Sequence, residues 1–132
     1  MPNGKDDRTR VLVVDADPDS LSSIERLLAR LGFNVLVSAD AEEAIKIAIE
    51  RSPAVALVEI HLPGSSGHAV VRRLRQAGVA SVPIMMSARG DIQDMLDSFS
   101  SGAIDYVRKP FNPRDLAALV ARAVAIHEKS SP

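Results

Sequence analysis

Residues 11–15 read Val11-Leu12-Val13-Val14-Asp15, a run of four aliphatic residues that ends in an acid. An uninterrupted apolar run of this length predicts a strand that is buried on both faces of a parallel sheet. Asp17 and Pro18 follow at once and are typical of a helix start, with Asp17 as the N-cap and Pro18 in the first turn. The chain therefore opens with a strand that leads directly into a helix.

The same order of strand and helix recurs along the chain. Further short apolar runs predict strands at residues 33–37, 55–58, 82–86 and 104–107. Helical spacing and capping residues predict helices from Pro18 to Gly32, from Asp40 to Ser52, after a loop at 62–67 up to Gly78, from Ile92 to Gly102, and from Asn112 onward. Each helix should turn its apolar residues inward, and in the fourth these are Ile92, Met95, Leu96 and Phe99.

This alternation predicts an α/β fold of the (βα)5 type. Right-handed crossovers give a doubly wound, five-stranded parallel sheet, for which the flavodoxin-like strand order 2-1-3-4-5 is favoured. In that order the first and third strands are neighbours, and the winding reverses between them. A ligand or a reaction is therefore expected in the crevice beyond the carboxyl ends of these two strands.

Composition limits the classes of function. The chain has 132 residues, 46% of them apolar, a net charge of −1 and no cysteine, which predicts one domain without disulfides. No basic run and no long apolar stretch is present, so neither nucleic acid nor a membrane is expected as a direct partner, and a cytoplasmic location is expected. The domain is predicted at residues 10–127, with a disordered tail at 1–9 and a tail or linker at 128–132.

Four polar residues end the strands that surround the expected crevice. Asp15 follows the first strand, Glu59 the third, Ser87 the fourth and Lys109 the fifth. One alternative is that strand ends are polar only because they meet water. A functional site is favoured, because two acids, a hydroxyl and an ammonium surround the one place where the winding of the sheet reverses.

The surrounding motifs resemble those of the receiver domain of two-component response regulators. They lie at residues 11–15, 59–67, 85–88 and 109–111, in the expected order, and the resemblance extends over residues 10–126. In that family two adjacent acids and an aspartate hold a magnesium ion, and the aspartate takes a phosphoryl group from a histidine kinase. Matching positions here are Asp15 for the first acid, Ser87 for the hydroxyl, Tyr106 for the switch aromatic and Lys109 for the phosphate-binding lysine.

Two positions depart from the family pattern. Ala16 stands where the second acid would be a metal ligand, and Glu59 replaces the phosphoacceptor aspartate. Magnesium is usually held by one or two carboxylates with water and phosphate, so Mg²⁺ should bind only weakly, through Asp15, Glu59 and the backbone of His61. A misplacement of about 1 Å costs on the order of a hundredfold in rate, and the extra methylene of glutamate moves the carboxylate by about that much.

Several alternatives remain open at the site. Glu59 either imitates the phosphorylated state by reaching toward Lys109 and Ser87, or forms a static ion pair with Lys109. Asp17 is interpreted as an N-cap, although a shifted loop would bring it into the crevice as a replacement acid. Pro110 is a candidate for a cis peptide bond that directs the lysine into the crevice, as the resemblance implies.

The main functional hypothesis is a pseudo-receiver, a phosphorylation-independent regulatory module and not an enzyme, with no cofactor expected. A receiver that retains weak, Mg²⁺-dependent phosphoryl transfer is the second hypothesis, and a flavodoxin-like cofactor binder is the third. Expected partners are a histidine kinase or another signalling protein, an attached output domain, or a second copy of the chain. The homodimer would use the face formed by the fourth helix, the fifth strand and the fifth helix. An alternative is that the charged residues of this face are only solvated. These residues are Asp97, Asp105, Arg108, Arg114 and Arg122.

Overall fold

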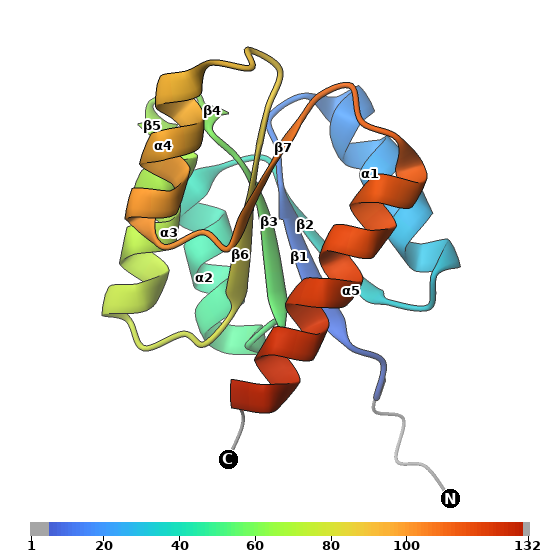
Figure 1. Cartoon of the computed structure of the whole chain (residues 1–132). Coiled ribbons are helices and arrows are strands. Elements are labelled where there is room, and N and C mark those ends of the chain that lie inside the picture. Colours follow the sequence, from blue (N-terminus) through green and yellow to red (C-terminus); the bar gives the residue numbers. More distant parts are fainter. Residues whose placement is uncertain (1–5, 131–132) are drawn as a thin grey trace, which may run out of the picture.

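The computed structural model describes residues 6–130 and has the predicted α/β architecture. The main sheet is parallel, in the order β2-β1-β3-β6-β7. Its strands are β1 (Arg10–Val14), β2 (Asn34–Ser38), β3 (Val55–Glu59), β6 (Val82–Ser87) and β7 (Asp105–Arg108). The helices are α1 (Pro18–Arg30), α2 (Ala41–Arg51), α3 (Gly67–Gln76), α4 (Ile92–Ser101) and α5 (Pro113–Ser130). This is the predicted order 2-1-3-4-5 (Figure 1).

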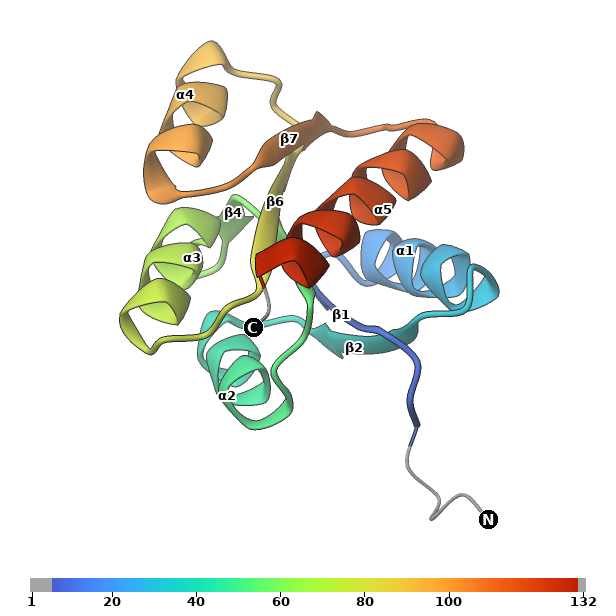
Figure 2. The same ribbon diagram turned by 60° about the horizontal axis from the view of Figure 1, so that its bottom comes forward.

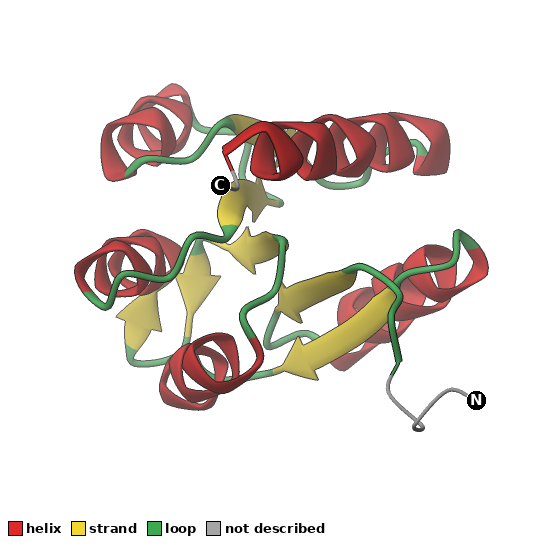
Figure 3. Cartoon of the chain, turned by 90° about the horizontal axis from the view of Figure 1, so that it is seen from below, coloured by secondary structure: helices red, strands yellow, loops and turns green. Residues whose placement is uncertain are grey.

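The helices cover both faces of the sheet, as the view from below in Figure 3 shows. Helices α1 and α5 lie on one side, and α2, α3 and α4 lie on the other (Figure 1). Successive residues of a strand point to opposite faces. In β1, Leu12 and Val14 therefore enter the core under α2 and α3, whereas Val11 and Val13 enter the core under α1 and α5. A strand buried in this way on both sides must be apolar throughout, which explains the run at residues 11–14.

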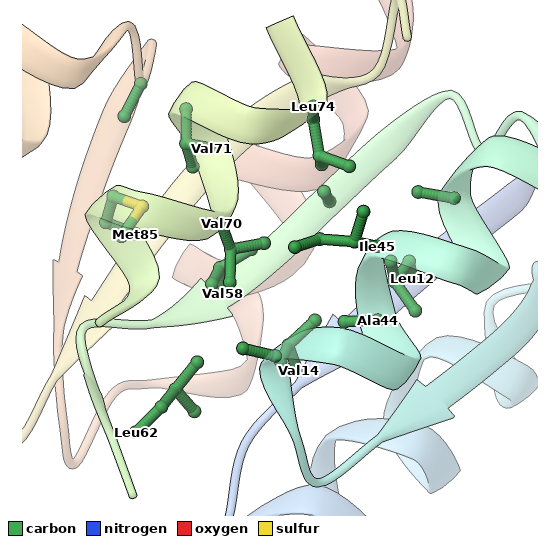
Figure 4. Close-up of a cluster of buried hydrophobic side chains, with 14 of the residues drawn as sticks. Leu12, Val14, Ala44, Ile45, Val58, Leu62, Val70, Val71, Leu74 and Met85 are labelled. Atoms are coloured by element: carbon green, nitrogen blue, oxygen red, sulfur yellow. The ribbon is translucent and has the colours of Figure 1, made fainter. Parts of the chain in front are cut away.

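The core under α2 and α3 is made of closely packed aliphatic side chains. Figure 4 shows Ala44 and Ile45 of α2 and Val70 of α3 directed toward Leu12 and Val58 of the sheet. The predicted inward residues of α3 are all buried: Val70, Val71 and Leu74. Fully burying an aliphatic side chain of this size contributes roughly 1.5–3 kcal/mol, so this core holds the strand ends in a fixed arrangement.

Helix starts follow the predicted capping chemistry. The carboxylate of Asp17 accepts the backbone N–H of Asp19 at 3.1 Å, and Pro18 begins α1. The carboxylate of Asp40 likewise accepts the N–H of Glu43 at 3.1 Å. These contacts satisfy amide groups that lack a partner inside the helix.

The segment at residues 62–67 is not the loop that the sequence predicts. It contributes to a short antiparallel pair of β4 (His61–Leu62) and β5 (Ser65–Ser66), and Gly67 already begins α3. A Cβ atom at Gly67 would lie 2.3 Å from the carbonyl oxygen of Glu59. Only glycine permits this close approach, so α3 can start directly beside the end of β3.

Helix α4 contradicts the predicted orientation of its apolar residues. Ile92 is 71% exposed, Leu96 52% and Phe99 48%, and Met95 is also exposed. The buried side chains are instead those of Ser98 and Ser101. Periodicity correctly identified the residues that share a face. It does not decide which face turns inward for a helix whose neighbours are α3 and the edge strand β7 (Figure 2).

Three further expectations need correction. Leu31 is 48% exposed and Ile49 is 53% exposed, although both belong to predicted inward stripes. Helix α5 runs through Ser130, so residues 128–130 are helical and not a tail. Residues 6–9 lie outside any helix or strand, whereas the predicted tail residues 1–5 and 131–132 lie outside the described part of the chain.

The outward orientation of α4 predicts different costs for two leucine substitutions. Leu116→Ala in α5 removes a side chain that is 0% exposed and should lower the free energy of unfolding by about 2–5 kcal/mol. Leu96→Ala in α4 should cost less than about 1 kcal/mol, because the side chain is already in water. Urea denaturation followed by circular dichroism measures both. Equal losses would mean that α4 packs its apolar face inward.

Candidate functional site

The four residues singled out at the strand ends come together at the carboxyl edge of the sheet, the upper edge in Figure 1. Asp15 follows β1, Glu59 ends β3, Ser87 ends β6, and Lys109 follows β7. Asp15, Glu59 and Ser87 are buried, although each is polar or charged. Buried polar groups require partners, so their contacts determine what the site can do.

Lys109 is the centre of the site. Its ammonium nitrogen Nζ lies 2.5 Å from Oδ2 of Asp15 and 2.7 Å from Oε1 of Glu59. The Lys109 side chain is 15% exposed, that of Asp15 2% and that of Glu59 9%. One cation therefore bridges two largely buried carboxylates, and the three groups together carry one excess negative charge.

The bridge changes the proton affinity of the lysine. Burial by itself lowers the pKa of Lys109, because water stabilises the charged ammonium better than the protein interior does. Hydrogen bonds to Asp15 and Glu59, and the attraction of both carboxylates, raise the pKa and outweigh burial. The pKa of Lys109 consequently lies above its ordinary value of 10.5.

Donors from the protein itself occupy all four carboxylate oxygens. Oδ1 of Asp15 accepts the backbone N–H of Asp17 at 3.0 Å, and Oδ2 accepts the hydroxyl of Ser20 at 2.7 Å in addition to Lys109. Oε2 of Glu59 accepts the backbone N–H of His61 at 3.1 Å, and Oε1 accepts Lys109. Ser20 was not identified from the sequence, although its place in the first turn of α1 was a usable signal.

The residues present fit a magnesium site poorly. Ala16 offers no side-chain oxygen, and the oxygens of Asp15 and Glu59 already accept hydrogen bonds. Within residues 6–130 no group of three or more His, Cys, Asp or Glu side chains is arranged to hold a metal ion. Mg²⁺ requires near-octahedral oxygen coordination, so it would have to displace the ammonium of Lys109 before binding.

An acid that sequence reasoning missed, Asp94 of α4, reaches the other side of the site. Its Oδ2 lies 2.8 Å from Nε2 of His61 and 3.5 Å from the hydroxyl oxygen of Ser87. The Ser87 hydroxyl also accepts the backbone N–H of Arg89 at 3.1 Å. Both the side chain and the backbone of His61 thus take part, whereas the sequence pointed to its backbone alone.

A pocket of about 270 Å³ opens beside these contacts. It is lined by Asp15, Ala16, Asp17, Glu59, His61, Ala88, Arg89 and Lys109. Asp17 lines the pocket while its carboxylate caps α1, which agrees with its interpretation as an N-cap. The lining of the pocket therefore combines three acids with the cations Arg89 and Lys109.

Two other predicted residues, Tyr106 and Pro110, lie close to Lys109 in the sequence. The Lys109–Pro110 peptide bond is cis, as predicted. The ring of Tyr106 is half-buried and packs against the core under α2 and α3. Its hydroxyl oxygen is buried and has no hydrogen-bond partner within residues 6–130. The ring therefore points inward, and no contact between Tyr106 and Ser87 is present among the hydrogen bonds of the described residues.

The charged residues predicted for a dimer face lie on α4, β7 and α5. Some of them make polar contacts within the domain, and others are exposed to solvent. Asp105 and Arg122 form an ion pair with each other at 3.2 Å, and Asp97 accepts the amide of Gln93 at 2.8 Å. Arg108 and Arg114 are exposed. The face therefore holds both signs of charge beside the exposed apolar residues of α4.

Comparison with known proteins identifies the family. The sequence profile described as the response regulator receiver domain matches residues 11–121. The chain belongs to the response regulator receiver family. Among curated relatives, the transcriptional regulatory protein PrrA of Mycobacterium tuberculosis is 42% identical to this receiver domain over 118 residues, 89% of this chain and 49% of the relative. This receiver domain thus spans about half the length of that relative.

Solved structures agree with this assignment. The CheY-like receiver domain protein of Methanospirillum hungatei has a TM-score of 0.88 and 27% identity, and the match covers 94% of this chain and 99% of that one. A putative response regulator from Chloroflexus aurantiacus has a TM-score of 0.84 and 31% identity, with 89% and 98% covered. Within residues 6–130 of the receiver domain, no helix is long and apolar enough to cross a membrane.

Removing the bridging cation should destabilise the receiver domain. Lys109→Met leaves Asp15 and Glu59 buried without their shared ammonium and should lower the free energy of unfolding at pH 7 by roughly 2–4 kcal/mol. Lys46→Met in α2 is the matched control, because Lys46 is exposed and its loss should cost less than about 0.5 kcal/mol. Urea denaturation of the three proteins gives the comparison.

The pH dependence of the same stabilisation has a defined sign. The pKa of Lys109 is higher in the folded state than its ordinary value of 10.5, so folding favours the protonated amine. Its stabilising contribution is complete below pH 10.5 and is lost as the pH rises through the folded-state value. The difference in melting temperature between the native protein and Lys109→Met should be constant from pH 7 to 10 and narrow above 10.5. A gap that is already closed at pH 9 would contradict the bridge.

Proposed function

We propose that this receiver domain is a phosphorylation-independent regulatory module of a two-component system and has no catalytic turnover of its own. The observation that carries the proposal is the ammonium of Lys109, which binds the carboxylates of both Asp15 and Glu59. The lysine that would bind an incoming phosphoryl group is thus already neutralised by the chain's own acids. Signalling would then depend on binding partners and not on a phosphorylation cycle.

The poor fit of the site to magnesium supports the same proposal. Phosphoryl transfer relies on positioning and on neutralisation of charge by the metal, and the protein adds little covalent chemistry. Ala16 removes one carboxylate from the metal site, and the longer Glu59 side chain holds its carboxylate against Lys109 and the N–H of His61. Both changes act on the same step, so their effects on the rate should compound.

The contacts of Glu59 favour imitation of the phosphorylated state over a purely static role. One carboxylate oxygen accepts a hydrogen bond from the ammonium of Lys109, and the other accepts one from the backbone N–H of His61. Both donors are groups that would hydrogen-bond the oxygens of a phosphoryl group. The inward ring of Tyr106 fits this interpretation in part, because its buried hydroxyl makes no hydrogen bond to Ser87 within the described residues. Glu59 carries a single negative charge, whereas a phosphoryl group carries up to two, so the imitation is partial.

The alternative function is a receiver that still accepts phosphate slowly on Glu59. The 270 Å³ pocket beside Glu59 and Lys109 leaves space for a small phosphodonor. In this case Mg²⁺ would have to displace Lys109 from the carboxylates. Mass measurement separates the two functions.

Receiver domains act with histidine kinases and output domains, and these are the proposed partners here. A second copy of the chain is a further proposed partner, through the face formed by α4, β7 and α5. Exposed Leu96 and Phe99 beside Asp97 and Arg108 give that face apolar and charged groups together. A cytoplasmic location is part of the proposal and rests on family membership alone.

Phosphorylation of the native protein should not be detectable. After incubation with acetyl phosphate and Mg²⁺, intact mass spectrometry should find the native mass unchanged. The double variant Ala16→Asp/Glu59→Asp restores both acids and should gain one phosphoryl group, which Mg²⁺ removal abolishes.

Two single variants serve as controls for this experiment. Ala16→Asp alone and Glu59→Asp alone should each show less phosphorylation than the double variant, because each repairs one of two defects. A phosphoryl gain by the native protein that Glu59→Gln abolishes would establish the alternative function. An inert double variant would show that the defect lies elsewhere in the site.

Self-association tests the proposed dimer face. Sedimentation velocity at low salt should show reversible dimerisation that Leu96→Asp weakens by at least about tenfold, since a charge would be buried in the interface. Leu31→Asp is the matched control, because Leu31 is 48% exposed and is the C-cap of α1, a helix that lies on the other side of the sheet from α4. A protein that stays monomeric at millimolar concentration and low salt would rule out the dimer.

A further inference from the structure

Helix α4 is attached to the domain by an unusual face. Its large apolar side chains point outward, and its inward residues are Ser98 and Ser101. The hydroxyl of Ser98 donates to the backbone oxygen of Asp94 at 2.7 Å, and that of Ser101 donates to the backbone oxygen of Ser98 at 2.8 Å. Both hydroxyls thus donate within the helix itself. Two polar contacts join this face to α3: Nε2 of His68 lies 3.3 Å from the Ser98 hydroxyl, and the guanidinium of Arg75 donates to the backbone oxygen of Ser101 at 3.2 Å. Small side chains bury little apolar area, so hydrophobic packing holds α4 only weakly.

The first turn of α4 also lacks the usual side-chain cap. Asp91 occupies the N-cap position, but its side chain makes no capping hydrogen bond. The acid of the first turn, Asp94, is directed to another part of the chain, where it meets Nε2 of His61 at 2.8 Å. The Asp94 side chain is only 14% exposed and that of His61 35%, so this contact is partly shielded from water.

This contact continues into the functional site. The backbone N–H of His61 binds Glu59, and Glu59 binds Lys109. On the other side, the hydroxyl of Ser87 donates to the same oxygen of Asp94 over a long 3.5 Å. A continuous series of polar contacts therefore runs from Lys109 through Glu59 and His61 to Asp94 on α4.

We propose that Asp94 is a positioning residue that ties α4, and with it the exposed apolar face of Ile92, Met95, Leu96 and Phe99, to the carboxylate of Glu59 through His61. The tie acts as an internal substitute for the link that a phosphoryl group would make to Ser87. The role of Asp94 deepens the proposed function. Its consequence for signalling rests on that function, whereas the attachment of α4 does not. In physical terms, losing Asp94 or His61 releases α4 while the sheet stays folded.

Hydrogen exchange of the full chain tests this release. In Asp94→Ala and in His61→Gln the amides of α4 should exchange roughly five- to thirtyfold faster than in the native protein, which corresponds to one or two kcal/mol of lost local stability. Amides of β1 and β3 should be unchanged. Asp97→Ala is the matched control, because Asp97 lies on the same helix, is exposed and accepts a hydrogen bond from Gln93 within that helix. It should leave α4 exchange within twofold of the native rate.

The double variant distinguishes a direct tie from a general effect on the helix. Asp94→Ala also removes a negative charge from the first turn, where that charge stabilises the helix through the helix dipole. His61→Gln leaves this charge in place. If the two residues act through one contact, Asp94→Ala/His61→Gln should exchange no faster than the faster single variant. If Asp94→Ala does not fold, His61→Gln alone carries the same expected acceleration.

The opposite results would overturn the proposal. One such result is native-like exchange of the α4 amides in His61→Gln; another is that Asp97→Ala accelerates their exchange as much as Asp94→Ala does. The proposal also fails if the accelerations of the two single variants multiply in the double variant, or if the amides of β1 and β3 accelerate as much as those of α4. Tyr106 supplies an independent readout, because the chain has one tyrosine and no tryptophan. Tyrosine fluorescence should change in Asp94→Ala and not in Asp97→Ala. None of these measurements involves phosphate, so phosphorylation of the native chain would refute the proposed function and leave this test intact.

Discussion

The ammonium of Lys109 between the carboxylates of Asp15 and Glu59 is the interaction on which the functional site depends. Removing two carboxylates from water is costly, and only an opposite charge at hydrogen-bond distance offsets that cost. The three groups come from the ends of β1, β3 and β7, so the bridge also joins three strands of the sheet. The chain's own ammonium thereby offsets part of the negative charge that the two buried carboxylates carry.

The doubly wound sheet explains why these groups meet. Its winding reverses between β1 and β3, so the connections leave the carboxyl ends of these strands in opposite directions and a crevice remains open between them. The aliphatic cores on both faces hold the strands in register, which fixes where Asp15 and Glu59 emerge. Gly67 adds a local constraint, since its missing Cβ lets α3 begin against the carbonyl of Glu59.

Helix α4 stands apart from this rigid framework. The other helices bury aliphatic residues against the sheet, whereas α4 buries serines and leaves Ile92, Leu96 and Phe99 in water. An exposed apolar face of this kind is a common mark of an interaction surface. A partly buried contact from Asp94 of α4 to His61 leads back to Glu59. The helix that carries the exposed apolar face is therefore also linked to the site by polar contacts.

Particular residues show what the sequence alone determined. The apolar run at residues 11–14 required a strand buried on both faces, and the residues that follow each strand had to meet at one edge of the sheet, because parallel strands end on the same side. Asp15, Glu59, Ser87 and Lys109 were therefore predictable as neighbours, and Asp17 was predictable as a helix cap. The Lys109–Pro110 cis bond was expected only from the resemblance to receiver domains.

Only the tertiary structure decided which of these neighbours bind one another, and which way α4 faces. Lys109 lies 50 residues from Glu59 and 94 from Asp15, and Asp94 lies 33 from His61. No local pattern encodes contacts over such separations. Helical periodicity likewise groups Ile92 with Leu96 and Phe99, but the space left beside α3 and β7 determines whether that group is buried. The physical reason is the same in both cases: spacing along a chain defines faces, and packing defines what each face meets.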